Sequence, residues 1–505
     1  MNKYEQFPIP LLAVLTLFLA LATFMQVLDT TIANVSIPTI AGDLGVTPTK
    51  GTWVITAFAV SNAIAMPLTG WLAKRFGEVR LFVFSTGLFS LTSMLCGMAP
   101  NYQLLIFGRV LQGAVAAPMM PLSQSLLLSN YPAHKKGLAL AFWSMTATLG
   151  PIAGPLLGGY ITDNFTWPWI FYINVPIGLL SAFIVWQMLK DRETKIAKFP
   201  IDYIGLGLLI VGVGCLQIML DKGNELDWFS SPTIIILCVI TVISISFFIV
   251  WELFDKHPVI DLMLFKSRNF TIGAISLSLG YTIFLGGGVV FPLWLQTQLG
   301  YTAFWAGFAS ATVGIFAFLF SPIVGSNMHR LNLRVLVTIS FILFGISYYW
   351  MSNFTTEIDL FHASVPRLLM GAAMSMYFVP LTAIILSELD QAHTASAMGL
   401  VNFLRILGGG LGTSIAVTFW ERWGKYHHAI LSEQINMFSH TTQTALTAIK
   451  HASVPALPII DHLITQQAMT RSNDDILLLS SYAFGGLILL IWFAKPPFMP
   501  SHPKR

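Results

Sequence analysis

Asp29 is the first side chain in the sequence whose position points to chemistry. It ends a long apolar stretch, and no charged residue separates it from Glu5. A charge in the middle of a membrane costs about 2.5–3.5 kcal/mol on insertion scales, so such a residue usually faces a bundle interior or a water-filled cavity. Burial also favours the neutral form of a carboxylic acid. The sequence therefore predicts that Asp29 takes up and releases a proton. The alternative is a structural carboxylate that accepts hydrogen bonds from hydroxyls or pairs with an arginine.

Arg109 is the second candidate for proton coupling. It lies a turn or two inside a later apolar stretch, and a guanidinium group stays charged. It could pair with a carboxylate or a backbone carbonyl, and its approach would lower the proton affinity of a neighbouring acid. The alternative is an arginine that packs at a helix end and extends its charge toward water. Arg367, near the outer end of its own apolar stretch, is interpreted as structural.

Polar side chains inside the apolar stretches are candidates for binding a substrate, because they are costly to leave without partners in lipid. Some of them recur at intervals of four residues, which places them on one face of a helix. Methionines and aromatic residues offer an adaptable surface for varied apolar ligands, although each taken singly more often packs in a core. The predicted substrate-binding residues are Gln26, Thr30, Asn34, Gln124, Gln296, Tyr377, Asn402 and Arg405.

Membrane-spanning helices must position these side chains. The chain has 505 residues, of which 55% are hydrophobic and only 10% charged, whereas a soluble domain carries about 25% charged residues. Continuous apolar runs of about 20 residues recur along the whole length, and each is long enough to cross a bilayer as a helix. Fourteen such spans are predicted. The predicted fold class is therefore an all-α membrane protein.

The placement of lysine and arginine predicts the orientation of the chain. The loops on the side of the N-terminus, together with both termini, carry 18 of these residues, and the loops on the other side carry 6. Because positively charged loops stay in the cytoplasm, both termini are predicted to be cytoplasmic. A long periplasmic loop is expected over 421–476, with an amphipathic helix on the membrane or on a partner. His427 and His428 within it lack metal-ligand spacing, so no metal site is predicted.

The sequence also repeats itself. The stretches that begin at Arg109 and Arg367 both read Arg-x-x-x-Gly and continue to a proline, and paired glycines follow in the next span of each half. Frequent glycine and proline in membrane helices would explain one such match, but not several in the same order. Duplicated bundles are a known plan of transporters, with the substrate site between the halves. We predict a six-helix bundle over 1–190, an inserted helix pair over 191–265 and a second six-helix bundle over 266–505.

With these motifs the sequence resembles the major facilitator superfamily, and more narrowly its fourteen-helix drug:proton antiporters. "LDTTIANVSIP" is similar to the first-helix signature of that branch, "GWLAKRFGEVR" to the loop motif after helix 2, and "GPIAGPLLGG" to the antiporter motif of helix 5. The resemblance implies the major facilitator fold and a conformational role for the loop and the helix-5 glycines, with ordinary close packing as the alternative. Lys74 departs from the usual aspartate of the loop motif. The implied conformational residues are Gly70, Lys74, Arg75, Gly77, Gly150, Pro151, Gly154, Pro155, Gly158 and Gly159.

The final "WFAKPPF" and the long outer loop resemble the EmrB-type multidrug exporters of Gram-negative inner membranes. That resemblance implies hydrophobic drugs and protons as the transported species. It also implies a periplasmic membrane-fusion adaptor and an outer-membrane channel as partners. No cofactor and no nucleic-acid partner are predicted.

The sequence gives no support to an enzyme. It contains no GxxxxGK[ST], HExxH or GxSxG motif, so neither ATP-driven transport nor these hydrolytic mechanisms are indicated. The leading prediction is a proton-driven exporter of hydrophobic toxic compounds that works by alternating access. A proton-coupled exporter of one dedicated metabolite stays open as an alternative, and a non-transporting membrane scaffold or sensor on the same fold is another.

Overall fold

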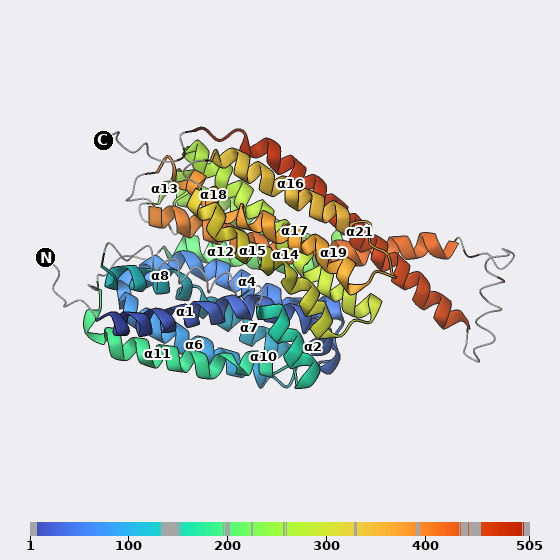
Figure 1. The fold of residues 1–505 in the computed structure, drawn as a ribbon, viewed down its shortest axis with the longest axis horizontal. Helices are drawn as coiled ribbons and strands as arrows, with labels where there is room; N and C mark the ends of the chain where they lie inside the picture. The colour runs from blue at the N-terminus through green and yellow to red at the C-terminus, as the bar shows by residue number, and fades with distance from the viewer. Residues whose placement is uncertain are drawn as a thin grey trace.

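Two groups of helices make up the protein, with the N-terminal half below and the C-terminal half above in Figure 1. Every regular element in the described part of the chain is a helix. Thirteen of the described helices are long and apolar enough to cross a membrane, so the predicted all-α membrane fold is confirmed. The fourteenth predicted span, 138–162, lies mostly outside the described residues. The computed structural model describes residues 8–132, 150, 153–194, 196, 202–223, 226–255, 258, 260–327, 331–389, 394–433, 435, 443, 456–496 and 498.

The N-terminal bundle is built from helices whose ends follow from their sequence. The first turn of α1 contains Pro10, which fits there because no backbone hydrogen bond is needed. The Asn101 side chain accepts a hydrogen bond from the Leu104 N–H at 2.9 Å and so caps α7. Besides the short α3 (Pro48–Gly51), η2 (Met66–Leu68), α5 (Thr69–Phe76) and η4 (Lys190–Arg192), the helices of this half are α1 (Ile9–Ile32), η1 (Ala33–Val35), α2 (Ile37–Asp43), α4 (Trp53–Ala65), α6 (Glu78–Gly97), α7 (Tyr102–Ala116), α8 (Met119–Asn130), a helix over 153–164, α10 (Trp169–Tyr172) and α11 (Asn174–Leu189).

The C-terminal bundle repeats the packing of the N-terminal bundle. Its helices are α14 (Arg268–Leu299), α15 (Ala303–Asn327), α16 (Leu333–Met351), α17 (Leu360–Ser375), α18 (Phe378–Leu386), α19 (Thr394–Glu433) and α21 (Ala456–Ile491). α1 packs on α8 and α11, as α14 packs on α18 and α21. α6 packs on α7 and α11, as α16 packs on α17 and α21. These equivalent pairs are what a duplicated six-helix unit predicts.

The two helices that the sequence predicts to be inserted between the bundles, α12 (Tyr203–Lys222) and α13 (Pro232–Phe254), pack on each other. α12 also contacts α4 of one bundle and α19 of the other. Gln217 Nε2 donates a hydrogen bond to Ser414 Oγ of α19 at 2.5 Å. Only 22% of the most apolar part of α13 is buried. The pair of α12 and α13 is therefore attached at the side where α4 and α19 meet, and α13 faces outward.

α19 and α21 extend beyond the bundle, where the sequence predicts a loop over 421–476. α19 continues to Glu433 and α21 begins at Ala456, so most of the predicted loop is a helical hairpin. The hairpin projects from the end opposite to the start of α1 (Figure 1). Its two helices are joined by polar contacts such as that of His427 Nε2 with Asp475 Oδ2 at 2.6 Å. The length of the apolar runs in the sequence does not predict this extension. Helices that pair with each other outside a membrane do not need an apolar outer surface.

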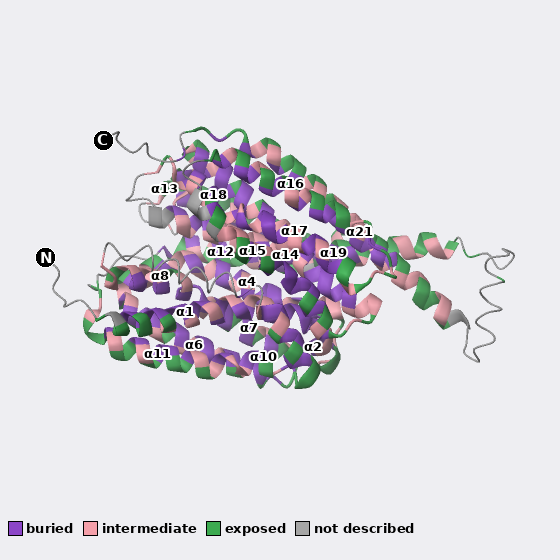
Figure 2. Cartoon of the chain, in the orientation of Figure 1, coloured by how far each residue is buried: buried purple, intermediate pink, exposed green. Residues whose placement is uncertain are grey.

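Figure 2 shows exposed residues on the outer faces of the helices and buried residues between the helices. Many of the exposed residues are large and apolar. Phe84, Ile236 and Phe247 are among the exposed residues. Exposed apolar side chains of this kind suit contact with acyl chains rather than with water. The buried polar and charged side chains lie instead inside the bundles.

Candidate functional site

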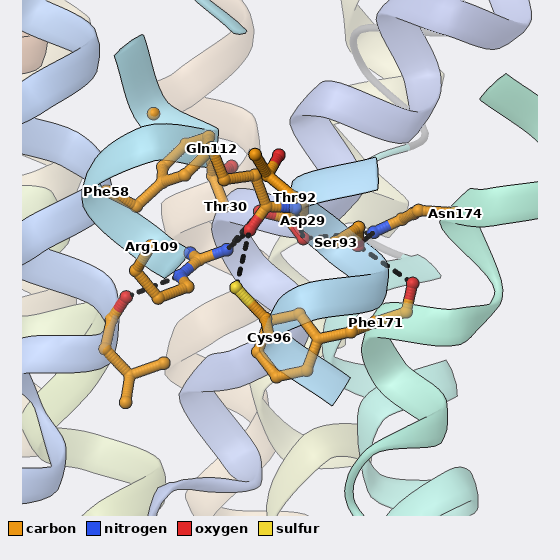
Figure 3. A network of polar contacts seen from close by, with 12 residues as sticks. Asp29, Thr30, Phe58, Thr92, Ser93, Cys96, Arg109, Gln112, Phe171 and Asn174 are labelled. Atoms are coloured by element: carbon orange, nitrogen blue, oxygen red, sulfur yellow. Dashed lines mark hydrogen bonds and ion pairs between the residues drawn. The ribbon is translucent and has the colours of Figure 1, made fainter. Parts of the chain in front are cut away.

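Asp29 lies near the C-terminal end of α1 and is completely buried. Its side chain points into the N-terminal bundle, toward residues of α6, α7 and α11 (Figure 3). Because α1 is apolar over most of its length, its only acidic residue is placed where other helices can surround it. A carboxylate buried in this way requires hydrogen-bond donors or a counter-ion.

Arg109 of α7 is that counter-ion. Its Nη1 lies 2.5 Å from Asp29 Oδ2, and both side chains are buried. Its Nε donates a hydrogen bond to the Val54 carbonyl of α4 at 2.7 Å. Its guanidinium carbon lies 4.3 Å from the centroid of the Phe58 ring, a favourable arrangement of a cation on an aromatic face. The arginine therefore reaches both a carboxylate and a backbone carbonyl.

Two amide side chains complete the network. Gln112, one turn after Arg109, accepts a hydrogen bond from Arg109 Nη1 at 2.7 Å and donates one to Asp29 Oδ1 at 3.2 Å. Asn174, the first residue of α11, donates to Asp29 Oδ1 at 3.0 Å and to Ser93 Oγ of α6 at 3.1 Å. Neither Gln112 nor Asn174 is among the site residues predicted from the sequence. The signal for Asn174 is its position inside an apolar stretch, where an amide needs a partner.

The geometry of Asp29 is that of an ionised side chain, since three N–H donors point at its two oxygens. A proton on either oxygen would remove the charge that compensates Arg109 and would weaken the ion pair. The network joins α1 to α6, α7 and α11. A single protonation at Asp29 would therefore alter contacts among four helices.

The helix over 153–164 packs closely on α1 because glycines line the contact. A Cβ atom at Gly150, Gly154 or Gly158 would collide with successive turns of α1. A neighbouring side of this helix touches the C-terminal bundle, where a Cβ at Gly159 would collide with the backbone of Ala303. The helix is thus packed tightly on its own bundle and on the other bundle at once.

Equivalent contacts occur in the second half of the chain. Gly408 and Gly412 of α19 lie against Thr282 of α14, as the glycines of the first half lie against α1. The two halves also touch each other where the carbonyl of Pro155, in the helix over 153–164, approaches Gly307 of α15. Predicted motif residue Pro151 lies outside the described part of the chain.

Residues 19–413 match the sequence model of the Major Facilitator Superfamily. The chain belongs to the major facilitator superfamily. It is 50% identical to the multidrug export protein EmrB of Haemophilus influenzae, over 99% of this chain and 100% of the relative. It is 51% identical to EmrB of Escherichia coli K12 over 96% of both chains. It is 49% identical to the fatty acid resistance protein FarB of Neisseria gonorrhoeae, over 96% of this chain and 97% of the relative.

Solved structures of other transporters of this fold resemble the chain despite low sequence identity. A bacterial homologue of the human lysosomal transporter Spinster aligns with a TM-score of 0.67 at 14% identity, over 97% of this chain and 98% of that chain. The POT family transporter PepTSo aligns with a TM-score of 0.63 at 13% identity, over 97% of this chain and 100% of that chain. These similarities support the fold alone.

In this member of the superfamily, the predicted loop motif forms α5 (Thr69–Phe76) and the turn that follows. Gly77 has φ +91°, a conformation that glycine adopts without strain. The Glu193 carboxylate, beyond the end of α11, accepts the backbone N–H groups of Val79 at 3.0 Å and Arg80 at 2.9 Å. The carboxylate therefore caps the first turn of α6, where the helix dipole favours a negative charge.

Three other predicted residues of the loop motif lie on α5. A Cβ at Gly70 would have no neighbour within 4 Å. Lys74 and Arg75 lie in the last turn of α5, where positive charges complement the helix dipole. The conformational role of Gly70, Lys74 and Arg75 stays a prediction.

We expect Glu193→Ala to destabilise the protein by about 1–2 kcal/mol, because two N–H groups of α6 lose a charged acceptor. Glu193→Gln keeps one side-chain acceptor and is expected to lose less. Thermal unfolding of the purified variants in detergent measures both effects. An alanine variant as stable as the wild type would contradict the capping role.

In the N-terminal half, the predicted substrate-binding residues differ in their contacts. Gln26 and Asn34 are buried, and in the described residues the side-chain carbonyl oxygen of each has no hydrogen-bond partner. Thr30 donates a hydrogen bond to the Val27 carbonyl at 2.6 Å. Gln124 is half-buried. The unsatisfied oxygens of Gln26 and Asn34 are buried in this conformation and would need a partner supplied by a ligand, by water or by a change of conformation.

In the C-terminal half, two of the predicted residues gather around Phe378. The Arg405 guanidinium carbon lies 5.5 Å from the centroid of that ring, and the Tyr377 ring lies 4.9 Å from it. The Tyr377 hydroxyl donates to the Leu277 carbonyl. Of the other two predicted residues, Gln296 donates a hydrogen bond to a carbonyl of its own helix at 3.2 Å, and Asn402 is half-buried. The substrate-binding role of all four stays a prediction.

Proposed function

We propose that the protein is an inner-membrane efflux transporter that exchanges protons for hydrophobic toxic compounds by alternating access. Two relatives named multidrug export protein are 50% and 51% identical over nearly their whole lengths, which supports this function. The apolar outer surface and the two related bundles suit a transporter whose cargo passes between its halves.

The observation that carries the proposed mechanism is the buried ion pair of Asp29 and Arg109 at 2.5 Å. In this conformation the ion pair of Asp29 and Arg109 is formed, and Asp29 is shielded from water. We propose that Asp29 receives its proton from the periplasm after the pair has separated and releases it to the cytoplasm when Arg109 returns. Such an exchange couples the proton to the bundle rearrangement because the two conformations differ in their affinity for the proton.

We also propose that both chain ends are cytoplasmic and that the hairpin of α19 and α21 projects into the periplasm. The excess of lysine and arginine in the loops on the side of the chain ends supports this orientation. A projecting helical hairpin offers a contact surface to a periplasmic membrane-fusion adaptor of the EmrA kind, which would link the transporter to an outer-membrane channel.

The second candidate function is the export of a narrower range of substrates. It is favoured by one observation, the 49% identity to a protein named for fatty acid resistance. Under this alternative the protein exports one class of acyl compound, with the same use of Asp29.

Cells with and without the gene, tested for growth on a panel of compounds, separate the two functions. The panel contains lipophilic weak acids, cationic dyes and long-chain fatty acids. We expect the deletion strain to be more sensitive to several unrelated compounds, because an adaptable apolar surface binds ligands of many shapes. Hypersensitivity to fatty acids alone would favour the narrower function, and unchanged sensitivity to every compound would contradict both.

A further inference from the structure

Asp163 forms a direct hydrogen bond between the two bundles. It lies in the last turn of the helix over 153–164, and its Oδ2 accepts a hydrogen bond from the backbone N–H of Phe304 at 2.7 Å. Phe304 belongs to the first turn of α15, in the C-terminal bundle. One turn before Asp163, a Cβ on Gly159 would collide with the backbone of the same Phe304. One face of the helix over 153–164 therefore contacts the start of α15 through both a close backbone approach and a carboxylate.

The start of α15 receives part of its capping from the other bundle. The first N–H groups of a helix have no acceptor within that helix. Thr302, directly before α15, offers its Oγ1 to the N–H of Trp305 at 3.5 Å, and Asp163 accepts the N–H of Phe304. A carboxylate at this place also compensates the positive end of the α15 dipole. A hydrogen bond to a charged acceptor is stronger than one to a neutral acceptor.

In its own helix, Asp163 occupies an unfavourable place. It lies near the C-terminal end of the helix over 153–164, where the helix dipole disfavours a negative charge. The two helix dipoles therefore favour this carboxylate more when the start of α15 lies beside it than when the two bundles separate. The contact contributes to the arrangement of the bundles and not only to the local structure of one helix.

The contact lies at the end of the molecule from which the hairpin of α19 and α21 projects. Shortly before α15, the carbonyl of Gln298 accepts a hydrogen bond from Gln466 Nε2 of α21 at 2.5 Å. A second hydrogen bond joins the bundles at this end, where Thr49 Oγ1 of α3 donates to Glu421 Oε1 of α19 at 3.3 Å. In the orientation proposed above, this end is periplasmic. The described conformation is thus held together at its periplasmic end.

Asp163 is exposed to solvent, unlike the buried pair of Asp29 and Arg109. When an exposed carboxylate separates from its partner, water takes the place of that partner, so no buried charge is left behind. The hydrogen bond of Asp163 can therefore form and break during a change of conformation. Loss of a helix cap of this kind changes an equilibrium by about 2- to 30-fold.

We propose that Asp163 is a positioning residue of the transport cycle, which stabilises the conformation closed at the periplasmic end by capping α15 of the opposite bundle. A contact made in only one of two conformations shifts the population toward that conformation. The inference rests on the proposed alternating access. It is tested on the purified protein without cargo, so its failure is distinguishable from a failure of the export function, which the growth panel measures.

The test is amide hydrogen–deuterium exchange of the purified full-length protein in detergent, compared between the wild type and Asp163→Ala. We expect exchange at the periplasmic end to increase by about 2- to 30-fold, both at the start of α15 and at the end of the helix over 153–164. We also expect exchange over α5 and the first turn of α6, at the cytoplasmic end, to decrease. Opposite changes at the two ends are the signature of a shift between two conformations, because one end closes as the other opens.

Two further variants make the result specific. Asp163→Asn keeps one side-chain acceptor without the charge, and we expect changes of the same sign but smaller size. Asn164→Ala is the matched control, because Asn164 is the neighbouring exposed residue and its Nδ2 donates to the Tyr160 carbonyl of its own helix at 2.9 Å; it should leave exchange at both ends unchanged. Faster exchange confined to the first turn of α15 in Asp163→Ala would show that the cap is only local and would overturn the proposal. Unchanged exchange in Asp163→Ala, or equal changes in Asn164→Ala, would overturn it as well.

Discussion

Asp29→Asn is expected to abolish proton-driven efflux and to destabilise the protein. Asparagine preserves the shape of the side chain but cannot carry the charge that compensates Arg109. Removing one partner of a buried ion pair costs about 3–5 kcal/mol, because the other charge stays buried. Efflux is lost for a separate reason, since an amide cannot take up and release the proton that Asp29 exchanges. Dye efflux from cells and thermal unfolding of the purified variant measure the two effects.

The double variant Asp29→Asn/Arg109→Gln separates folding from coupling. It removes both charges and leaves amides that can form hydrogen bonds with Gln112 and Asn174 in place of the ion pair. We expect it to recover most of the lost stability, because no uncompensated charge stays buried, and to remain inactive in efflux. A double variant that regains stability together with proton-driven efflux would show that the ion pair is only structural.

Gly159→Val is expected to have the second-largest effect on transport. A Cβ at this position would collide with the backbone of Ala303 and Phe304 in the opposite bundle, and a backbone cannot move aside as a flexible side chain does. Overpacking costs about 1–3 kcal/mol, which corresponds to a shift of about 5- to 150-fold between two conformations. The arrangement in which the two bundles touch here would be depleted, and transport would fall accordingly. Initial rates of dye efflux measure the loss.

Gly485→Val is the matched control for that change. Gly485 lies within α21, and a Cβ there would have no neighbour within 4 Å. The same substitution is therefore expected to leave efflux close to the wild-type rate. Equal efflux by the Gly159 variant and the control would contradict the importance of the contact between the helix over 153–164 and α15.

Much of the fold follows from the sequence because a bilayer limits the structures that can cross it. Uninterrupted apolar runs mark the spans, and repeated motifs predict the equivalence of the two halves. The hairpin of α19 and α21 could not be predicted in this way. Beyond Trp420 the sequence becomes polar, and apolar length no longer shows that a helix continues. Contacts between the two helices, such as that of Trp420 Nε1 with the Met469 carbonyl at 3.1 Å, appear only in the structure.

The charged residues of the site could be predicted from the sequence, because charges are rare in apolar stretches. The contacts among side chains from several helices could not be predicted. Asp29 and Arg109 stand out because each interrupts an apolar stretch, but their mutual distance depends on the packing of α1 against α7. Asn174 is hidden in an aromatic stretch, and its role requires the contact of α11 with α1 and α6. Arg367 has the same sequence context as Arg109, so only the structure reveals that no described carboxylate reaches it.

The central claim is that the buried carboxylate of Asp29 exchanges its proton for cargo. It is tested most directly in proteoliposomes that contain a pH-sensitive dye and the purified protein, with drug added on one side. For the wild type, we predict proton movement opposite to the drug, and for the Asp29→Asn/Arg109→Gln variant, folded and able to bind the drug, none. Proton movement of wild-type size in that variant would contradict the account.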